Sequence, residues 1–333
     1  MRAALTAPTE RLHVVTAPSS QQIATFAQDV ASGLSAEPKK LNSKYFYDAI
    51  GSALFGAIML MPEYYLTRAE SEILHEWGWE IVRSLGSPVE FIELGSGSAD
   101  KTRLLIGEAL RVQGTLSYSP IDISVDALET SAIALVEKYS QLRITGFVGD
   151  YVTLLGTTHL QRSGKVMMMF MGSNIGNYEP QEATALLEKI AKILKPGDGF
   201  LLGADLKKDP RELLQAYDDP TGVTAAFNKN LLARINRELG GTFELEHFAH
   251  LVEYDESEGC VRSYLVSKRT QTVEIKAGTL HIPFAFDERI HTESAYKYTP
   301  ETLAQLATSA GLRVARTWND RSDRFSVNLL VRA

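Results

Sequence analysis

Between residues 89 and 205, short apolar runs alternate with segments whose apolar residues recur at helical spacing. The runs have the length of buried strands, and the segments between them have the length of helices. We expect strands at 89–94, 116–123, 142–148, 165–171 and 200–205, and helices at 101–113, 125–139 and 180–194. Strands that alternate with helices form a parallel sheet with helices on both faces. The pattern therefore predicts an α/β fold.

Near the C-terminus, a helical segment at 300–310 precedes two extended runs, 313–318 and 325–331. The polar residues 319–324 join these runs, so we expect an antiparallel strand pair. The pair would complete the sheet at one edge. One domain is therefore expected to combine residues 65–206 with residues 296–333.

Two segments do not follow the alternation. Residues 21–64 are expected to form short helices, and residues 207–295 begin with helices at 211–217 and 222–239. Strands are expected afterwards at 251–254, 261–268 and 279–286. We expect both segments to pack together as a second α+β lobe over the carboxyl ends of the sheet strands, where α/β folds bind ligands. Residues 1–20, rich in Ala, Thr, Pro and Ser, are expected to be a mobile leader.

Composition narrows the classes of function. The chain has 333 residues, a net charge of −7 and no long Lys/Arg block, which disfavours nucleic-acid binding. A single cysteine, Cys260, excludes an intrachain disulfide framework and a cysteine-rich metal site. No apolar run reaches the ~18 residues that a membrane span needs. We therefore expect a cytoplasmic monomer that acts on a small molecule, without a metal, a nucleic acid or a membrane.

A Gly-x-Gly turn follows the first expected strand. Gly95 and Gly97 come directly after the run 89–94. Glycines there let the backbone bend sharply and let a ligand approach the main chain. A dinucleotide site prefers a third glycine, where Asp100 stands here, and no P-loop lysine follows. The turn favours S-adenosylmethionine, whose positive centre suits acidic neighbours such as Glu93; a purely structural turn is the alternative.

The next two expected strands also end in acidic residues. Asp122 ends the second strand, where a carboxylate can accept both ribose hydroxyls of a nucleoside. Asp150 ends the third strand, where it can meet the adenine amine while Tyr151 lies against the base. Lys101, just after the glycine turn, can hold the methionine carboxylate. The alternatives are that both acids cap helices and that Lys101 is solvated. Together, signals at three successive strand ends favour the methyl donor.

Amide and aromatic side chains indicate where an acceptor would bind. Asn177 follows the fourth expected strand, and its amide can orient an amine or a carboxylate; a turn-forming role is the alternative. Tyr217 ends the helix expected at 211–217, and Tyr64 lies in a Pro-Glu-Tyr-Tyr segment. Read alone, either tyrosine fits a core position better than a binding site.

Longer motifs resemble a known family. The matching blocks are Tyr45–Ser52, Pro62–Arg68, Glu93–Ser98, Ile175–Asn177 and Ala216–Asn228. They resemble the L-histidine Nα-methyltransferases of ergothioneine biosynthesis, and the likeness runs from about Lys40 to Val331. The blocks around Tyr47 and Tyr217 are specific to that family. The resemblance implies a class I, Rossmann-like sheet of seven strands and three methyl transfers from S-adenosylmethionine to the α-amine of histidine, giving hercynine.

The resemblance also implies roles for individual residues. The methyl donor would be bound by Gly95, Lys101, Asp122, Asp150 and Tyr151. The amine and carboxylate of histidine would be held beside the reacting methyl group by Tyr47, Asn177 and Tyr217. The imidazole would be contacted by Tyr64 and Glu293. The proton released by the amine would pass to Tyr47 or to water.

Two positions depart from the family pattern. Ala295 stands where the family has a serine near the imidazole, with Ser294 beside it, and Ser263 stands where the family often has a methionine lining the pocket. A lost hydrogen bond to the substrate ring can change side-chain choice. An N-methyltransferase of tryptophan or tyrosine is therefore an alternative. A non-catalytic nucleotide-binding protein is an alternative of another class, and Asp100 disfavours a dehydrogenase.

Overall fold

The computed structural model describes residues 10–16, 19–157, 162 and 164–333. Within them, the main sheet has eight strands in the order β1-β5-β4-β3-β6-β7-β14-β13. β14 runs antiparallel to both of its neighbours, whereas the other pairs are parallel. The strands are β1 (Leu12–Thr16), β3 (Val89–Leu94), β4 (Leu116–Asp122), β5 (Leu142–Val148), β6 (Lys165–Phe170), β7 (Gly199–Asp205), β13 (Leu312–Asn319) and β14 (Phe325–Arg332).

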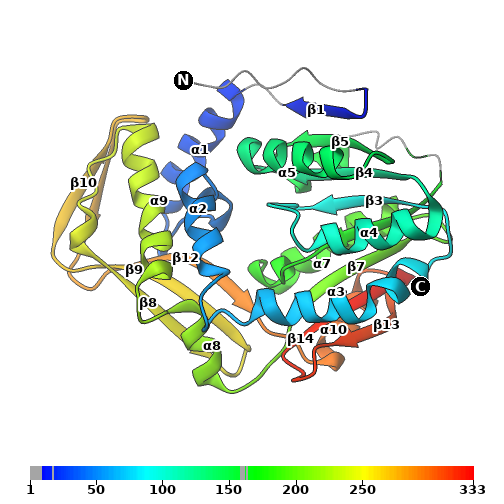
Figure 1. The fold of residues 1–333 in the computed structure, drawn as a ribbon. Helices are drawn as coiled ribbons and strands as arrows, with labels where there is room; N and C mark the ends of the chain where they lie inside the picture. Colours follow the sequence, from blue (N-terminus) through cyan, green and yellow to red (C-terminus); the bar gives the residue numbers. More distant parts are fainter. Residues whose placement is uncertain (1–9, 17–18, 158–161, 163) are drawn as a thin grey trace.

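Helices cover both faces of the main sheet (Figure 1). Phe91 of β3 packs into the core formed with α3 (Leu66–Arg83), α4 (Thr102–Gln113) and α5 (Val125–Lys138). Its neighbour Ile92 packs into the core formed with α6 (Tyr151–Thr157), α7 (Pro180–Ile193) and α10 (Pro300–Ser309). Successive strand residues point to opposite faces, so a strand buried on both sides is apolar throughout. This is why the apolar runs were recognisable as strands.

A second layer of structure lies beside the carboxyl ends of the parallel strands (Figure 1). Its sheet has the order β2-β12-β9-β8, and a separate hairpin pairs β10 with β11. The strands are β2 (Lys39–Lys40), β8 (Phe248–Asp255), β9 (Cys260–Ser267), β10 (Gln271–Ile275), β11 (Leu280–Phe284) and β12 (Arg289–Tyr296). The helices are α1 (Ser19–Leu34), η1 (Ser43–Phe46), α2 (Ala49–Ile58), α8 (Pro210–Tyr217), α9 (Val223–Leu239) and η3 (Leu245–His247).

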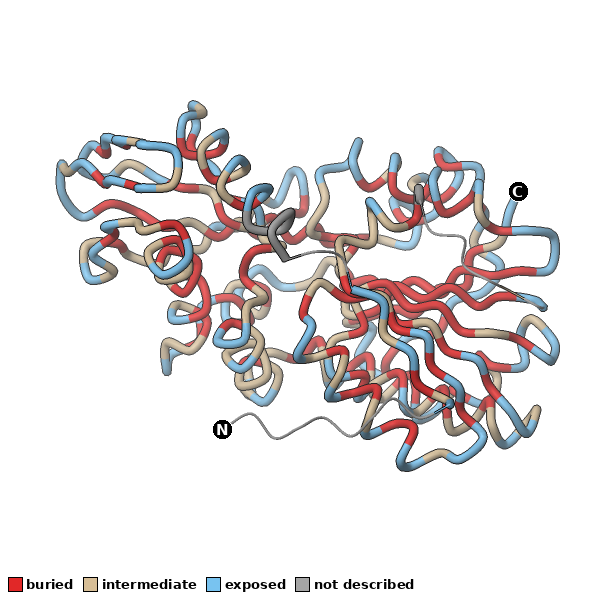
Figure 2. The backbone as a smooth tube through the Cα atoms, turned by 90° about the horizontal axis from the view of Figure 1, so that it is seen from above, coloured by how far each residue is buried: buried red, intermediate tan, exposed pale blue. Residues whose placement is uncertain are grey.

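This second layer has its own apolar core. Phe46, Phe227 and Leu265 belong to it, together with other buried residues of α1, α9 and the strands. Buried residues lie in the interiors of the two layers, while helix faces that point outward are exposed (Figure 2). The segments 21–64 and 207–295, expected to form a second lobe, contain these elements. We propose that the second layer and the main sheet with its helices are two functional units.

Two parts of the chain differ from the sequence-based expectation. Within the expected leader 1–20, residues 12–16 form β1, which pairs in parallel with β5, and α1 begins at Ser19. The leader expectation is therefore wrong for these residues, because β5 offers a free edge whose backbone groups the segment satisfies. Residues 1–9 and 17–18 lie outside the described residues. The strand β12 and the helix α3 were also not expected.

Backbone hydrogen bonds join the two layers where β7 and β12 end. The amide of Tyr298 donates to the Asp205 carbonyl at 2.9 Å, and the amide of Lys207 donates to the Tyr298 carbonyl at 2.8 Å. The short helix η2 (Asn174–Asn177) packs closely against the end of β12. A side-chain carbon added at Gly176 would come within 2.6 Å of the Tyr296 carbonyl oxygen. The end of β12 is thus held close to the carboxyl ends of β6 and β7.

Candidate functional site

The glycine turn lies where the strand order reverses. β3 is flanked by β4, which follows it in the chain, and by β6, and the carboxyl end of such a strand is the usual ligand position in open α/β sheets. Gly95 and Gly97 both have positive φ, 70° and 51°, which glycine adopts without strain. A side-chain carbon at Gly97 would meet nothing within 4 Å, so that side of the turn is open. The buried hydroxyl of Ser96 has no partner among the described residues.

Asp122 fixes the shape of this turn. Its carboxylate accepts hydrogen bonds from the Gly97 amide at 2.7 Å and the Ser124 amide at 2.8 Å. Burial raises the pKa of Asp122, although those backbone donors oppose the shift. The capping role considered as an alternative is thus observed at the start of α5, and the same carboxylate also holds the glycine turn. The expected contact of Asp122 with a ribose stays a prediction.

Asp150 and Tyr151 lie at the start of α6. Asp150 accepts a hydrogen bond from the Val152 amide at 2.8 Å, which is the helix-capping role considered as an alternative. The Tyr151 hydroxyl shares a 2.7 Å hydrogen bond with Tyr178. Tyr151 also borders the glycine turn, because a side-chain carbon at Gly95 would lie 3.9 Å from its ring. The aromatic face expected beside an adenine is therefore next to the turn.

Lys101 has a partner that sequence reasoning missed. Its ammonium pairs with the carboxylate of Glu70, a fully buried residue of α3. Glu70 also accepts a hydrogen bond from the Gly172 amide at 2.9 Å, at the end of β6. Lys101 is thus held across the carboxyl ends of β3 and β6, close to Gly172. Its position between two strand ends is not that of an ordinary solvated lysine.

Glu93 is a structural acid in this arrangement. It is buried and accepts hydrogen bonds from the hydroxyls of Thr102 and Tyr118. Burial raises its pKa to about 7, while these donors act in the opposite direction. Glu93 therefore ties β3 to α4 and β4, and its carboxylate is bonded within the protein.

Aromatic rings of the second layer form a continuous chain of contacts. The Tyr47 ring packs edge-on against Phe55 at 5.6 Å, Phe55 packs against Tyr64 at 6.1 Å, and Tyr64 packs against Tyr217 at 6.5 Å between ring centres. Burial and the charge of Glu293 both raise the pKa of Tyr47, and Glu293 contributes likewise at Tyr64 and Tyr217. We call Tyr47, Tyr64, Tyr217 and Glu293 the tyrosine–glutamate cluster.

Three of the four polar groups of this cluster lack partners in the described part of the chain. Among the described residues, no hydrogen bond or ion pair is made by the Glu293 carboxylate, and none by the hydroxyls of Tyr47 and Tyr64. All three side chains are nevertheless only partly exposed. Burial raises the pKa of Glu293 to about 7, with a smaller opposing effect of Lys297. These hydroxyl and carboxylate groups are partly accessible and unpaired, so they are free to bind a polar ligand.

The cluster lies close to the glycine turn. Besides Glu293, the charge of Asp122 raises the pKa of Tyr47, and Tyr47 in turn contributes to the raised pKa of Tyr151. Asn177 ends η2, which packs against β12, the strand that carries Glu293. Asn174, which the sequence did not single out, lies next to the turn, with its amide nitrogen 3.4 Å from a side-chain carbon placed at Gly95. The residues expected to bind the donor and those expected to bind the acceptor therefore lie near each other.

Comparison with known proteins identifies the family. The family model described as "Histidine-specific methyltransferase, SAM-dependent" matches residues 26–332. The chain belongs to this methyltransferase family. It is 38% identical to the histidine N-alpha-methyltransferase of Mycolicibacterium smegmatis over 92% of this chain and 94% of that protein. It is 39% identical to the histidine N-alpha-methyltransferase of Mycobacterium tuberculosis over 91% of this chain and 93% of that protein.

A more distant relative in the same family acts on another amino acid. The L-tryptophan methyltransferase of Psilocybe serbica is 25% identical over 86% of this chain and 87% of that protein. Family membership makes the chain an S-adenosylmethionine-dependent methyltransferase and confirms the expected family and fold class. The expected seven strands are all found, and β1 adds an eighth at the β5 edge within the described part of the chain.

The two departures from the family pattern lie near Glu293 in this methyltransferase. Ser263 is the direct cross-strand partner of Glu293 in the pairing of β9 with β12. Residues paired in this way share a face of the sheet, so Ser263 lies beside Glu293. Ala295, two residues along β12, is buried in the core that contains Tyr217. Both positions can therefore influence the surroundings of a bound side chain.

Ser294 lies on the other face of β12. Its hydroxyl donates to Glu179 at 3.1 Å and lies 3.1 Å from Nε2 of His291. Alternate residues of a strand point in opposite directions, so Ser294 cannot take the place of the family serine at Ala295. A direct contact between Ser294 and the substrate, expected from sequence, is therefore not favoured by these neighbours.

Proposed function

We propose that this methyltransferase transfers methyl groups from S-adenosylmethionine to the α-amine of L-histidine, in three rounds, to give hercynine for ergothioneine biosynthesis. Its relatives named histidine N-alpha-methyltransferase support this activity. The observation in the structure that best supports histidine is the unpaired Glu293 carboxylate, held at the end of a chain of tyrosine rings. An imidazole N–H is a suitable partner for such a group. We also propose that the enzyme acts as a monomer.

Each round would proceed by direct displacement. The donor supplies a methyl group on a positively charged sulfur; the carbon–sulfur bond breaks as a carbon–nitrogen bond forms, and a neutral thioether leaves. The α-amine must first lose a proton, because an ammonium has no lone pair. The protein's contribution is then alignment of amine and methyl group. We assign donor binding to the glycine turn, Lys101, Asp122, Asp150 and Tyr151, and their position at the carboxyl ends of neighbouring strands supports this assignment.

Tyr47 is a poor candidate for a phenolate base. Burial, Glu293 and Asp122 all raise its pKa well above the ordinary value of 10.0, so the hydroxyl stays protonated at neutral pH. A neutral Tyr47 can accept a hydrogen bond from the amine or donate one to water. We propose that Tyr47 and Asn177 orient the amine and that water carries the proton away. Tyrosine faces also favour the cationic product through cation–π attraction of ~0.5–2 kcal/mol.

Kinetics of Glu293→Gln test the choice of substrate. Glutamine keeps the size of the side chain and removes the charge, so KM for histidine is expected to rise by about tenfold or more with a smaller change in kcat. Glu274→Gln is the matched control, because Glu274 is exposed on the β10–β11 hairpin. An unchanged KM for histidine in Glu293→Gln would show that this carboxylate does not contact the imidazole.

A further inference from the structure

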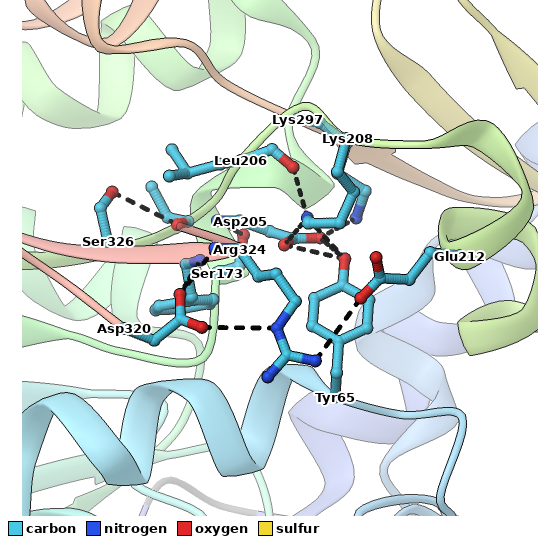
Figure 3. Close-up of polar contacts among 12 residues, drawn as sticks. Tyr65, Ser173, Asp205, Leu206, Lys208, Glu212, Lys297, Asp320, Arg324 and Ser326 are labelled. Atoms are coloured by element: carbon cyan, nitrogen blue, oxygen red, sulfur yellow. Dashed lines mark hydrogen bonds and ion pairs between the residues drawn. The ribbon is translucent and has the colours of Figure 1, made fainter. Parts of the chain in front are cut away.

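A buried polar cluster lies directly behind Tyr217. Its centre is Asp205, the last residue of β7, which is fully buried (Figure 3). The Asp205 carboxylate accepts hydrogen bonds from the Tyr65 hydroxyl at 2.9 Å and from Lys208 at 2.6 Å. It also forms an ion pair with Lys297 at 2.9 Å. Two ammonium groups therefore face one carboxylate at this point.

Lys297 links this cluster to the proposed substrate site. It follows β12 directly, and its side chain is 1% exposed. Its amide donates to the Gly259 carbonyl at 2.8 Å, and the next residue, Tyr298, bonds to Asp205, so the backbone is held on both sides. Its ammonium donates to the Tyr217 hydroxyl at 2.7 Å and lies 4.5 Å from the centre of the Tyr217 ring.

This contact determines which way the Tyr217 hydroxyl points its hydrogen. An ammonium has donors only, so the Tyr217 oxygen must be the acceptor in the contact with Lys297. Burial raises the pKa of Tyr217 well above 10.0, so the phenol keeps its proton. Among the described residues, no acceptor for that proton is found. The Tyr217 hydroxyl is thus left as a free donor beside Tyr64 and Glu293.

We propose that Lys297 is a positioning residue that holds the Tyr217 hydroxyl as a hydrogen-bond donor toward the α-carboxylate of the amino-acid substrate. This role rests on the proposed function. Lys297 acts through its hydrogen bond to the Tyr217 hydroxyl and not through contact with the substrate. The amide of Asn177 would complete the carboxylate site from η2. Lys297 therefore favours amino acids over amines that lack the carboxylate.

Comparison of histidine with histidinamide tests this role. The two substrates share the imidazole and the amine, so any effect that Lys297 exerts through Glu293 cancels in the ratio of their kcat/KM values. We expect Lys297→Met to lower the preference for histidine over histidinamide by about tenfold or more relative to the wild-type enzyme. Lys208→Met is the matched control, because Lys208 bonds Asp205 and Tyr65 but makes no bond to Tyr217. It should keep the wild-type ratio.

Tyr217→Phe makes the test independent of stability. In that background Lys297 has no hydroxyl to orient, so adding Lys297→Met should leave the histidine-to-histidinamide ratio unchanged. An unaltered ratio in Lys297→Met alone, or an equal fall in Lys208→Met, would overturn the proposal. If the wild-type enzyme methylates tryptophan and not histidine, the proposed function fails, and tryptophan against tryptophanamide then measures the role of Lys297 by the same ratio.

Discussion

At the scale of single residues, the site depends on charges that are paired over long distances in the sequence. Lys101 pairs with Glu70, and Lys297 pairs with Asp205. The sequence identified Lys101 from its place after the glycine turn, but it contains no local signal for Glu70. A buried ion pair between distant segments becomes visible only when the fold brings its members together. Glu293 was likewise found through family resemblance and not through spacing.

The unpaired Glu293 predicts a cost in stability at neutral pH. Its pKa in the folded protein, about 7, lies above the ordinary value of 4.5, so the fold favours the protonated form. The resulting stability is fully present below pH 4.5 and is lost as pH rises through about 7. Relative to the wild-type enzyme, Glu293→Gln should therefore gain more unfolding free energy at pH 8 than at pH 5. We expect the two gains to differ by about 1–3 kcal/mol.

Urea unfolding of the free enzyme at both pH values measures this difference. Glu274→Gln, on the exposed hairpin, should show no comparable dependence on pH. A gain for Glu293→Gln that is the same at pH 5 and pH 8 would mean that the Glu293 carboxylate is well solvated in the free enzyme.

At the scale of elements, the strands of the main sheet from β3 onward and the helices α4, α5 and α7 were predicted to within a residue or two, whereas α6 was not expected. The strands β6 and β7 are buried on both faces, and their sequences are almost wholly apolar. By contrast, β12 reads Arg-Ile-His-Thr-Glu-Ser-Ala-Tyr and was not predicted. Its polar residues serve the site and its neighbours, so the pattern that marks a core strand is weakened. β1 was missed because most of its side chains are exposed or only half-buried.

The packing of η2 against β12 predicts a strong effect of Gly176→Ala. The added carbon would come within 2.6 Å of the Tyr296 carbonyl oxygen and 3.2 Å of its amide nitrogen, so the backbone must shift. Because η2 carries Asn177 and β12 carries Glu293, the shift should lower kcat/KM for histidine by about tenfold or more.

Gly56→Ala in α2 is the control for this substitution. A carbon at Gly56 would meet nothing within 4 Å, so activity should be kept and the helix slightly stabilised. Steady-state kinetics and thermal unfolding of both variants make the comparison. If Gly176→Ala lost stability but kept its kcat/KM, the spacing of η2 and β12 would not matter for the reaction.

At the scale of the whole molecule, the proposed reaction needs both layers. The donor residues lie at the carboxyl ends of β3, β4 and β5, whereas Glu293 and Tyr217 come from β12 and α8. The seam between Asp205 and Tyr298 holds these parts in register. In the described part of the chain, no helix combines the length and apolar character of a membrane span. This arrangement suits the proposed alignment of two small substrates between the layers.

The most direct test of this account is mass spectrometry of each of the twenty amino acids after incubation with the enzyme and S-adenosylmethionine. The account predicts that histidine gains up to three methyl groups on its α-nitrogen and that tryptophan and tyrosine gain little or none. Fragmentation of the product would locate the methyl groups. Methylation of tryptophan or tyrosine with histidine left unmodified would contradict the proposed substrate, and it would point to Ser263 and Ala295 as the positions that changed it.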